Sequence, residues 1–178
     1  MRKTHGTVDF ADSSSRLLPR PLTEIVQRAI IGGMAVLRME HVGIVVEDMG
    51  AAIDYFVALG LELEGEGEVG GDWVDRVIGV EGTKSQIAML KSPDGSSSIE
   101  LSKFLSPETR EGEPGAPTNT LGLRHLSFLV DDVDESLARI APHGGELIGG
   151  PENYADIYRL CYVRGPAGTI VELAEKLS

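Results

Sequence analysis

Cysteine, aromatic residues and long apolar runs are all scarce in this chain of 178 residues. The single cysteine, Cys161, excludes an intramolecular disulfide framework. Since no apolar segment of a secretory signal follows the basic start, we expect a cytoplasmic protein. No apolar run approaches the roughly eighteen residues that cross a bilayer. Lys and Arg total 16 against 28 Asp and Glu, so no basic surface for a nucleic acid is expected.

The first 35 residues differ in character from the rest of the chain. Residues 13–20 are polar and interrupted by proline, whereas residues 22–31 have the apolar spacing of a helix. We therefore expect residues 1–35 to form an arm, partly helical or disordered, before a domain over residues 36–178. Met34 is a second candidate for the natural start of the chain.

The most informative feature of the sequence is an internal repeat. A shift of 84 residues lays residues 41–65 over 125–149 without a gap, and seven of the 25 residues are identical. The identical pairs are His41/His125, Val46/Val130, Asp48/Asp132, Gly60/Gly144, Glu62/Glu146, Leu63/Leu147 and Gly65/Gly149. Such a match at a fixed offset predicts two copies of one structural module.

A second match closes each copy. Residues 91–101 and 164–173 share a turn with proline and glycine, followed by a Glu between two aliphatic residues. The segment between the copies is rich in proline and glycine, as linkers are. We therefore predict a first module over 36–104, a linker over 105–120 and a second module over 121–178.

Each copy has the pattern of a βαβββ module. Apolar residues alternate in the first segment as in a strand, and the Asp that follows is a typical N-cap of a helix. The predicted strands are 41–46, 61–67, 84–91 and 98–104, then 123–130, 146–148, 158–164 and 169–175, with helices over 49–59 and 133–142. We expect an α+β fold in which two tandem modules form an open, cup-shaped mixed sheet with the helices outside.

Strand alternation predicts that each copy carries a His and a Glu on the same face of its sheet. Because successive side chains of a strand leave opposite faces, Leu126 would pack under the helix while His125 points away from it. The residues predicted on this open face are His41 and Glu100 in the first copy and His125 and Glu172 in the second. Their predicted neighbours are small: Gly43, Ser98, Ser102, Ser127 and Ala174.

These four residues predict a metal site. A single His or Glu on such a strand is ordinarily a packed or solvated residue, but equivalent positions in both copies favour a common role. Two imidazoles and two carboxylates suit one divalent ion with positions left for water or substrate. The ligand set does not choose among Ni, Co, Fe, Mn and Zn.

Several segments resemble the vicinal oxygen chelate superfamily, which includes glyoxalase I, methylmalonyl-CoA epimerase, extradiol dioxygenases and bleomycin or fosfomycin resistance proteins. They are HVGIVVED (41–48), IELSKF (99–104), RHLSFLVDDVDESLARI (124–140) and YVRGPAGTIVELAE (162–175). The resemblance extends over residues 38–176. It implies two βαβββ modules in an open cup, with metal ligands on the first and last strand of each, at the four positions found from the repeat.

Departures from the family narrow the expected chemistry. Val45 and Phe104 stand where glyoxalase I usually has an Arg and an Asn that hold glutathione, so glutathione is not expected. The strands resemble those of methylmalonyl-CoA epimerase more closely, although Arg124 precedes His125 where that enzyme usually has two adjacent His. A fourth ligand, Glu100, disfavours oxygen chemistry.

The resemblance implies a metal-dependent isomerase or lyase that acts on a carbon next to a carbonyl, of the methylmalonyl-CoA epimerase or glyoxalase I type. The metal would stabilise an enolate and a carboxylate would move the proton, with Glu172 the first choice and Glu100 its partner. The candidates to receive an anionic substrate group are Arg124, Arg159, Tyr158 and Lys103, each of which is otherwise a solvated surface residue.

Two alternatives stay open. One is a non-catalytic small-molecule-binding or antibiotic-resistance protein of the same fold, and the other is an extradiol-type dioxygenase. In each case we expect a small-molecule ligand, no nucleic acid, no membrane and a homodimer, as is usual in the superfamily.

Overall fold

The computed structural model describes residues 36–177 of the chain. The description below concerns the unit Met39–Ser178. The expected arm, with the candidate start Met34, lies outside the described residues. Among the helices that the structure describes, none is long and apolar enough to cross a membrane.

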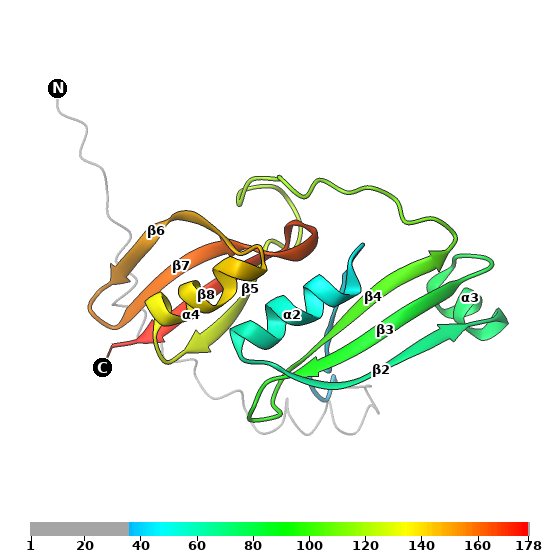
Figure 1. The fold of residues 1–178 in the computed structure, drawn as a ribbon, viewed down its shortest axis with the longest axis horizontal. Helices are drawn as coiled ribbons and strands as arrows, with labels where there is room; N and C mark the ends of the chain where they lie inside the picture. Colours follow the sequence, from blue (N-terminus) through cyan, green and yellow to red (C-terminus); the bar gives the residue numbers. More distant parts are fainter. Residues whose placement is uncertain (1–35, 178) are drawn as a thin grey trace, which may run out of the picture. The chain divides into compact units, whose positions relative to one another are not determined.

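The first copy of the repeat folds as a four-stranded mixed sheet in the order β1-β4-β3-β2 (Figure 1). Its elements are β1 (Val42–Val45), α2 (Met49–Leu59), β2 (Glu62–Gly70), α3 (Asp72–Ile78), β3 (Lys84–Lys91) and β4 (Ser98–Ser106). β1 pairs in parallel with β4, and the other pairs are antiparallel. The βαβββ pattern is confirmed here, with the short helix α3 as an unpredicted insertion between β2 and β3.

The second copy repeats this order as β5-β8-β7-β6. Its elements are β5 (His125–Val130), α4 (Val133–Ile140), η2 (Ala141–His143), β6 (Glu146–Tyr154), β7 (Tyr158–Arg164), η3 (Pro166–Gly168) and β8 (Ile170–Lys176). β6 is longer than predicted because a register shift between Ile148 and Glu152 lets an edge strand continue past glycine and proline. The α+β fold of two tandem modules is confirmed, as two open four-stranded sheets.

Matched residues of the repeat begin the main helices in the same way. The carboxylate of Asp48 accepts a hydrogen bond from the backbone N–H of Ala51 at 3.0 Å, and that of Asp132 accepts one from Glu135 at 2.7 Å. Each bond satisfies one of the backbone donors left free at a helix start. The equivalent Asp residues thus fix where each helix leaves its first strand.

The core lies between the helices and the sheets and draws on both copies. The largest fully buried side chains include Tyr55 and Phe56 of α2, Leu90 and Leu101 of the first sheet, and Ile140, Val163 and Leu173 of the second half. α2 contacts α4, so the two halves are joined on the helix side of their sheets (Figure 1). Cys161 is buried in this core, and burial raises the pKa of its thiol, which fits a packing role.

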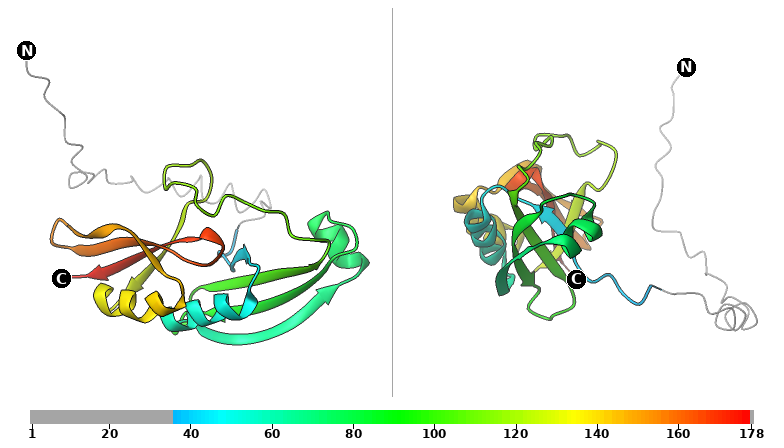
Figure 2. Two further views of the ribbon diagram at one scale, coloured as in Figure 1. Left: turned by 45° about the horizontal axis from the view of Figure 1, so that its top comes forward. Right: turned by 90° about the vertical axis from the view of Figure 1, so that its right-hand side faces the viewer.

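The linker between the halves is fastened to the second sheet. It leaves the end of β4 and returns to the start of β5, as the left-hand view of Figure 2 shows. The guanidinium of Arg164 donates hydrogen bonds to the carbonyl oxygens of Pro114 at 2.6 Å, Ala116 at 3.1 Å and Gly168 at 3.2 Å. One side chain of β7 therefore holds both the linker and the turn that leads into β8.

Candidate metal centre

The second half brings its His and Glu together on the open face. In the parallel pairing of β5 with β8, Ser127 lies opposite Glu172, and His125 is two residues before Ser127, so the two side chains share a face. The Nε2 atom of His125 lies 3.2 Å from Oε2 of Glu172. The Glu172 side chain is 18% exposed and that of His125 38%. The pair is thus half-buried and still open to a ligand.

This separation matches two neighbouring ligands of a metal ion. Bonds of about 2.1 Å that meet at about 100° place a nitrogen and an oxygen about 3.2 Å apart. The same two atoms, 3.2 Å apart here, could therefore bind one divalent cation without moving relative to each other. The second half of the chain therefore has the donor atoms and the spacing expected of two of the four predicted ligands.

The first half places its pair on the equivalent face, but each residue contacts a chain neighbour. Gly43 pairs with Glu100, and His41 is two residues before Gly43. The Nδ1 atom of His41 is bonded to the carboxylate of Glu40, and Oε1 of Glu100 accepts a hydrogen bond from the Ser102 hydroxyl at 3.0 Å. His41 and Glu100 therefore share a face without being held as a pair.

The two pairs do not converge within one chain. Over residues 36–177, no three His, Cys, Asp or Glu side chains lie together as a metal site would require. The contact of α2 with α4 and with the turns η2 and η3 joins the halves on their helix sides, away from the four predicted ligands. The single four-ligand site expected from the repeat stays a prediction, and one chain presents it as two half-sites.

Tyr162 is a residue of this face that the sequence analysis missed. It lies on β7 directly opposite Glu172 of β8, and its ring is 5.0 Å from the ring of His125 at an interplanar angle of 32°. The length of the hairpin could have identified it. Arg164 pairs with Ile170 next to the turn, and two residues further from the turn on each strand Tyr162 pairs with Glu172. The equivalent position across from Glu100 is held by Met89.

The four predicted substrate contacts are scattered. Tyr158 shares the open face with Tyr162, four residues along β7. Arg159 lies on the other face and donates two hydrogen bonds to Asp134 of α4, at 2.6 and 2.8 Å, so its guanidinium is occupied on the helix side. Lys103 alternates with Glu100 along β4 and leaves the opposite face.

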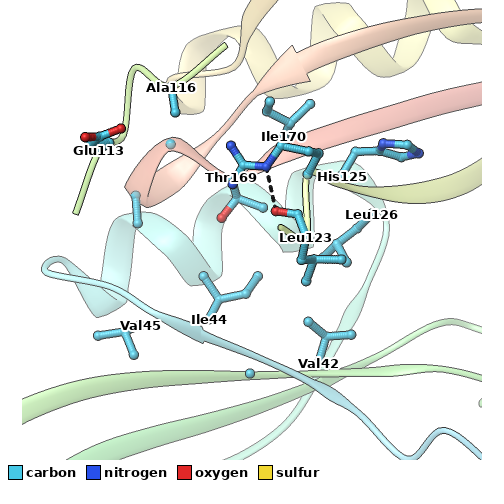
Figure 3. Close-up of a pocket in the computed structure, with 14 residues that line it drawn as sticks. Val42, Ile44, Val45, Glu113, Ala116, Leu123, His125, Leu126, Thr169 and Ile170 are labelled. Carbon is cyan, nitrogen blue, oxygen red and sulfur yellow. Dashed lines mark hydrogen bonds between the residues drawn. The ribbon is translucent and has the colours of Figure 1, made fainter. Parts of the chain in front are cut away.

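Arg124 lines a pocket of about 330 Å³ between the edge strands β1 and β5. Val42, Ile44 and Val45 form one wall, while Glu113 and His125 lie toward opposite ends (Figure 3). The guanidinium Nε of Arg124 donates to the carbonyl oxygen of Leu123 at 2.8 Å. Arg124 therefore lines a cavity that also reaches a predicted metal ligand, His125.

Comparison with known proteins agrees with this fold. Residues 40–162 match the model of the Glyoxalase/Bleomycin resistance protein/Dioxygenase superfamily. The chain belongs to this superfamily, as its strands had suggested.

Individual relatives extend the match. A 2-epi-5-epi-valiolone epimerase from an Actinomyces species is 31% identical over 134 residues, which are 72% of this chain and 70% of that one. The crystal structure of a glyoxalase family protein from Bacillus cereus is 46% identical, with a TM-score of 0.78 over 82% of this chain and 97% of that one. A fosfomycin resistance protein from Listeria monocytogenes, crystallised with Mn(II), shares the fold at 14% identity, with a TM-score of 0.51 over 78% of this chain and 90% of that one.

Proposed function

We propose that this chain is a metal-dependent isomerase or lyase that acts on a carbon next to a carbonyl, and that its reaction is an epimerisation. The observation that carries the proposal is the pair His125 and Glu172, whose donor atoms lie 3.2 Å apart on the open face of a family fold. The Actinomyces relative supports epimerisation over the other reactions of the type. Inversion at a carbon next to a carbonyl requires a group that removes a proton and a site that accepts the charge.

The four residues would hold one divalent ion, as Mn(II) is bound in the Listeria relative. When bound, such an ion stabilises the negative charge that a carbonyl oxygen gains as the neighbouring carbon loses its proton. The proton itself would be moved by a carboxylate of this chain, Glu172 or Glu100. Arg124, beside the pocket between β1 and β5, is the candidate to orient an anionic group of the substrate.

A second copy of the chain would complete the site. One chain offers two half-sites on two open faces, and each face carries exposed apolar surface beside its His: Val45 is 45% exposed and Leu129 71%. Each sheet also has an edge strand, β1 or β5, next to these residues. A twofold dimer that sets the first half of one chain against the second half of its partner would cover both faces and form two equal four-ligand sites.

The proposal is tested by proton exchange in deuterated water. The full chain, loaded in turn with Ni, Co, Fe, Mn or Zn, is incubated with 2-epi-5-epi-valiolone, acyl-CoA thioesters and 2-oxoaldehyde hemithioacetals. We expect deuterium to enter the carbon next to the carbonyl of at least one substrate, and elemental analysis to find metal in the wild type and less in Glu172→Gln. The proposal is rejected if none of the substrates takes up deuterium and elemental analysis finds no metal in the protein.

The alternative is a small-molecule-binding protein that uses the same cup without chemistry. It is favoured by Val45 and Phe104, which replace the glutathione-binding residues expected of a glyoxalase I. In that case chelators would leave the melting temperature unchanged, and a ligand would bind to the chain in the absence of metal. Oxygen uptake with a catechol and Fe(II) would instead favour a dioxygenase.

A further inference from the structure

The two halves of the repeat differ in the residue that lies directly across the hairpin from each proposed Glu ligand. The residue directly across from Glu172 in the sheet is Tyr162, whereas the residue across from Glu100 is Met89. Because directly paired residues of neighbouring strands share a face, Tyr162 and Met89 both lie on the open side of their sheet with the Glu. The repeat is therefore asymmetric at the place where its two Glu side chains are oriented.

In the second half, the aromatic ring limits how the ligands can move. The ring of Tyr162 contacts His125 with centroids 5.0 Å apart, and His125 in turn reaches Glu172 at 3.2 Å. A rigid ring with two side-chain torsions restricts the rotamers of the imidazole beside it, so less conformational entropy is lost when a ligand binds. The pair is thus held close to the geometry that a metal requires.

In the first half, the equivalent position carries a flexible side chain in place of the ring. The thioether of Met89 has three rotatable bonds and adapts to its surroundings. His41 is hydrogen-bonded to Glu40, and Glu100 accepts a hydrogen bond from the Ser102 hydroxyl at 3.0 Å. The Ser102 hydroxyl rotates freely about its C–O bond, so Glu100 can exchange this one donor for another.

We infer that Tyr162 is a positioning residue that preforms the His125–Glu172 pair, so that the second half anchors the metal and Glu100 of the first half is the carboxylate that moves the proton. This inference rests on the proposed function. In the step, the carbon–hydrogen bond of the substrate breaks, the proton forms a new bond to an oxygen of Glu100, and the electron pair stays on the substrate. Inversion is completed when the planar carbon takes a proton from water on its opposite face, and Glu100 releases its own proton to solvent, which restores the carboxylate.

The positioning role is tested by exchanging the two residues between halves. Co(II) binding to the full chain is measured by calorimetry and by visible absorption for Tyr162→Met, which copies the first half, and for Tyr162→Phe, which keeps the ring. We expect Tyr162→Met to weaken Co(II) binding about tenfold or more, as loss of residues that orient metal ligands typically does, and Tyr162→Phe to bind as the wild type does. The matched control is Tyr154→Met, the same change on the same sheet at a half-exposed position.

A gain-of-function variant guards against a folding defect. Met89→Tyr gives the first half the ring that it lacks, and we expect it to tighten Co(II) binding and to lower proton exchange, because Glu100 is then held as a ligand. Equal Co(II) affinity in Tyr162→Met and the wild type would overturn the inference and leave the proposed function standing.

The division of roles is tested by the two Glu variants. We expect Glu172→Gln to weaken Co(II) binding on the order of 100-fold, and Glu100→Gln to bind Co(II) within about threefold of the wild type while proton exchange is lost. If both variants lose Co(II) equally, the halves are equivalent and the inference is wrong. If the wild type binds no Co(II), the proposed function fails together with it.

Discussion

A side chain at position 168 would collide with Pro114. A Cβ atom built on Gly168 lies 2.2 Å from the carbonyl oxygen of Pro114 and 2.3 Å from its Cα atom. The linker therefore rests directly on the turn between β7 and β8, where Arg164 also binds it. Glycine is required here by the approach of another backbone segment as well as by a positive φ of 74°.

We predict that Gly168→Ala destabilises the protein more than a glycine change without that contact. Gly149 is the matched control, because its φ of 76° carries the same strain while nothing lies within 4 Å of its added Cβ. Gly149→Ala is expected to cost about 1–2 kcal/mol from backbone strain, and Gly168→Ala a further ~1–3 kcal/mol from overpacking. Urea denaturation measures both, and equal losses would mean that the linker moves away freely.

Tyr55 of α2 is fully buried, and within the described residues its hydroxyl has no hydrogen-bond partner. Burial raises the pKa of this phenol, so it stays neutral. Since an unsatisfied buried hydroxyl is costly, Tyr55→Phe is expected to stabilise the protein by about 1 kcal/mol. Tyr55→Ala, which removes the ring, should cost about 3–5 kcal/mol by comparison. A loss on Tyr55→Phe in chemical denaturation would mean that the hydroxyl does bind a partner.

The pair of Arg159 and Asp134 predicts a pH-dependent stability. Hydrogen bonds from the guanidinium hold the pKa of Asp134 below its ordinary value. Because the folded pKa is lower than the unfolded one, near 3.9, the pair stabilises the fold above that pH and is lost as pH falls through the lowered value. Asp134→Asn should therefore be less stable than the wild type at pH 7, with the difference disappearing in acid. Thermal melts across pH test this, with exposed Asp54→Asn as the control.

The elements that local patterns specify could be predicted from the sequence. The helix beginnings follow from Asp48 and Asp132, and the faces of β5 and β8 follow from the alternation of side chains. Helix α3 could not be found in this way. It is one short helix in which Val74 is buried while Trp73 and Val77 are 58% and 75% exposed, so its apolar residues lie on both sides and mark no single packed face.

Within the candidate site, the sequence could predict only the residues that stand at equivalent positions of the two copies. Equivalent positions identify His125 and Glu172, and the observed register agrees with their common face. Which partner each charged group contacts depends on how distant elements pack, and no local pattern encodes that. The bond of Arg159 to Asp134 joins residues 25 apart, on β7 and α4, and this removes Arg159 from the open face.

If each four-ligand site is formed between two chains, two differently inactivated variants should restore it when they are mixed, whereas a site within one chain cannot be restored in this way. One variant carries His41→Ala and Glu100→Gln, and the other carries His125→Ala and Glu172→Gln, so neither forms a complete site by itself. In a mixed dimer, the intact second half of the one meets the intact first half of the other, which restores one site of two. Since random mixing makes half of the dimers mixed, about a quarter of the wild-type Co(II) capacity should return.

Sedimentation with labelled chains confirms that mixed dimers form. Mixed dimers without recovered Co(II) binding would place all four ligands within one chain, because mixing cannot repair a site that each chain builds alone.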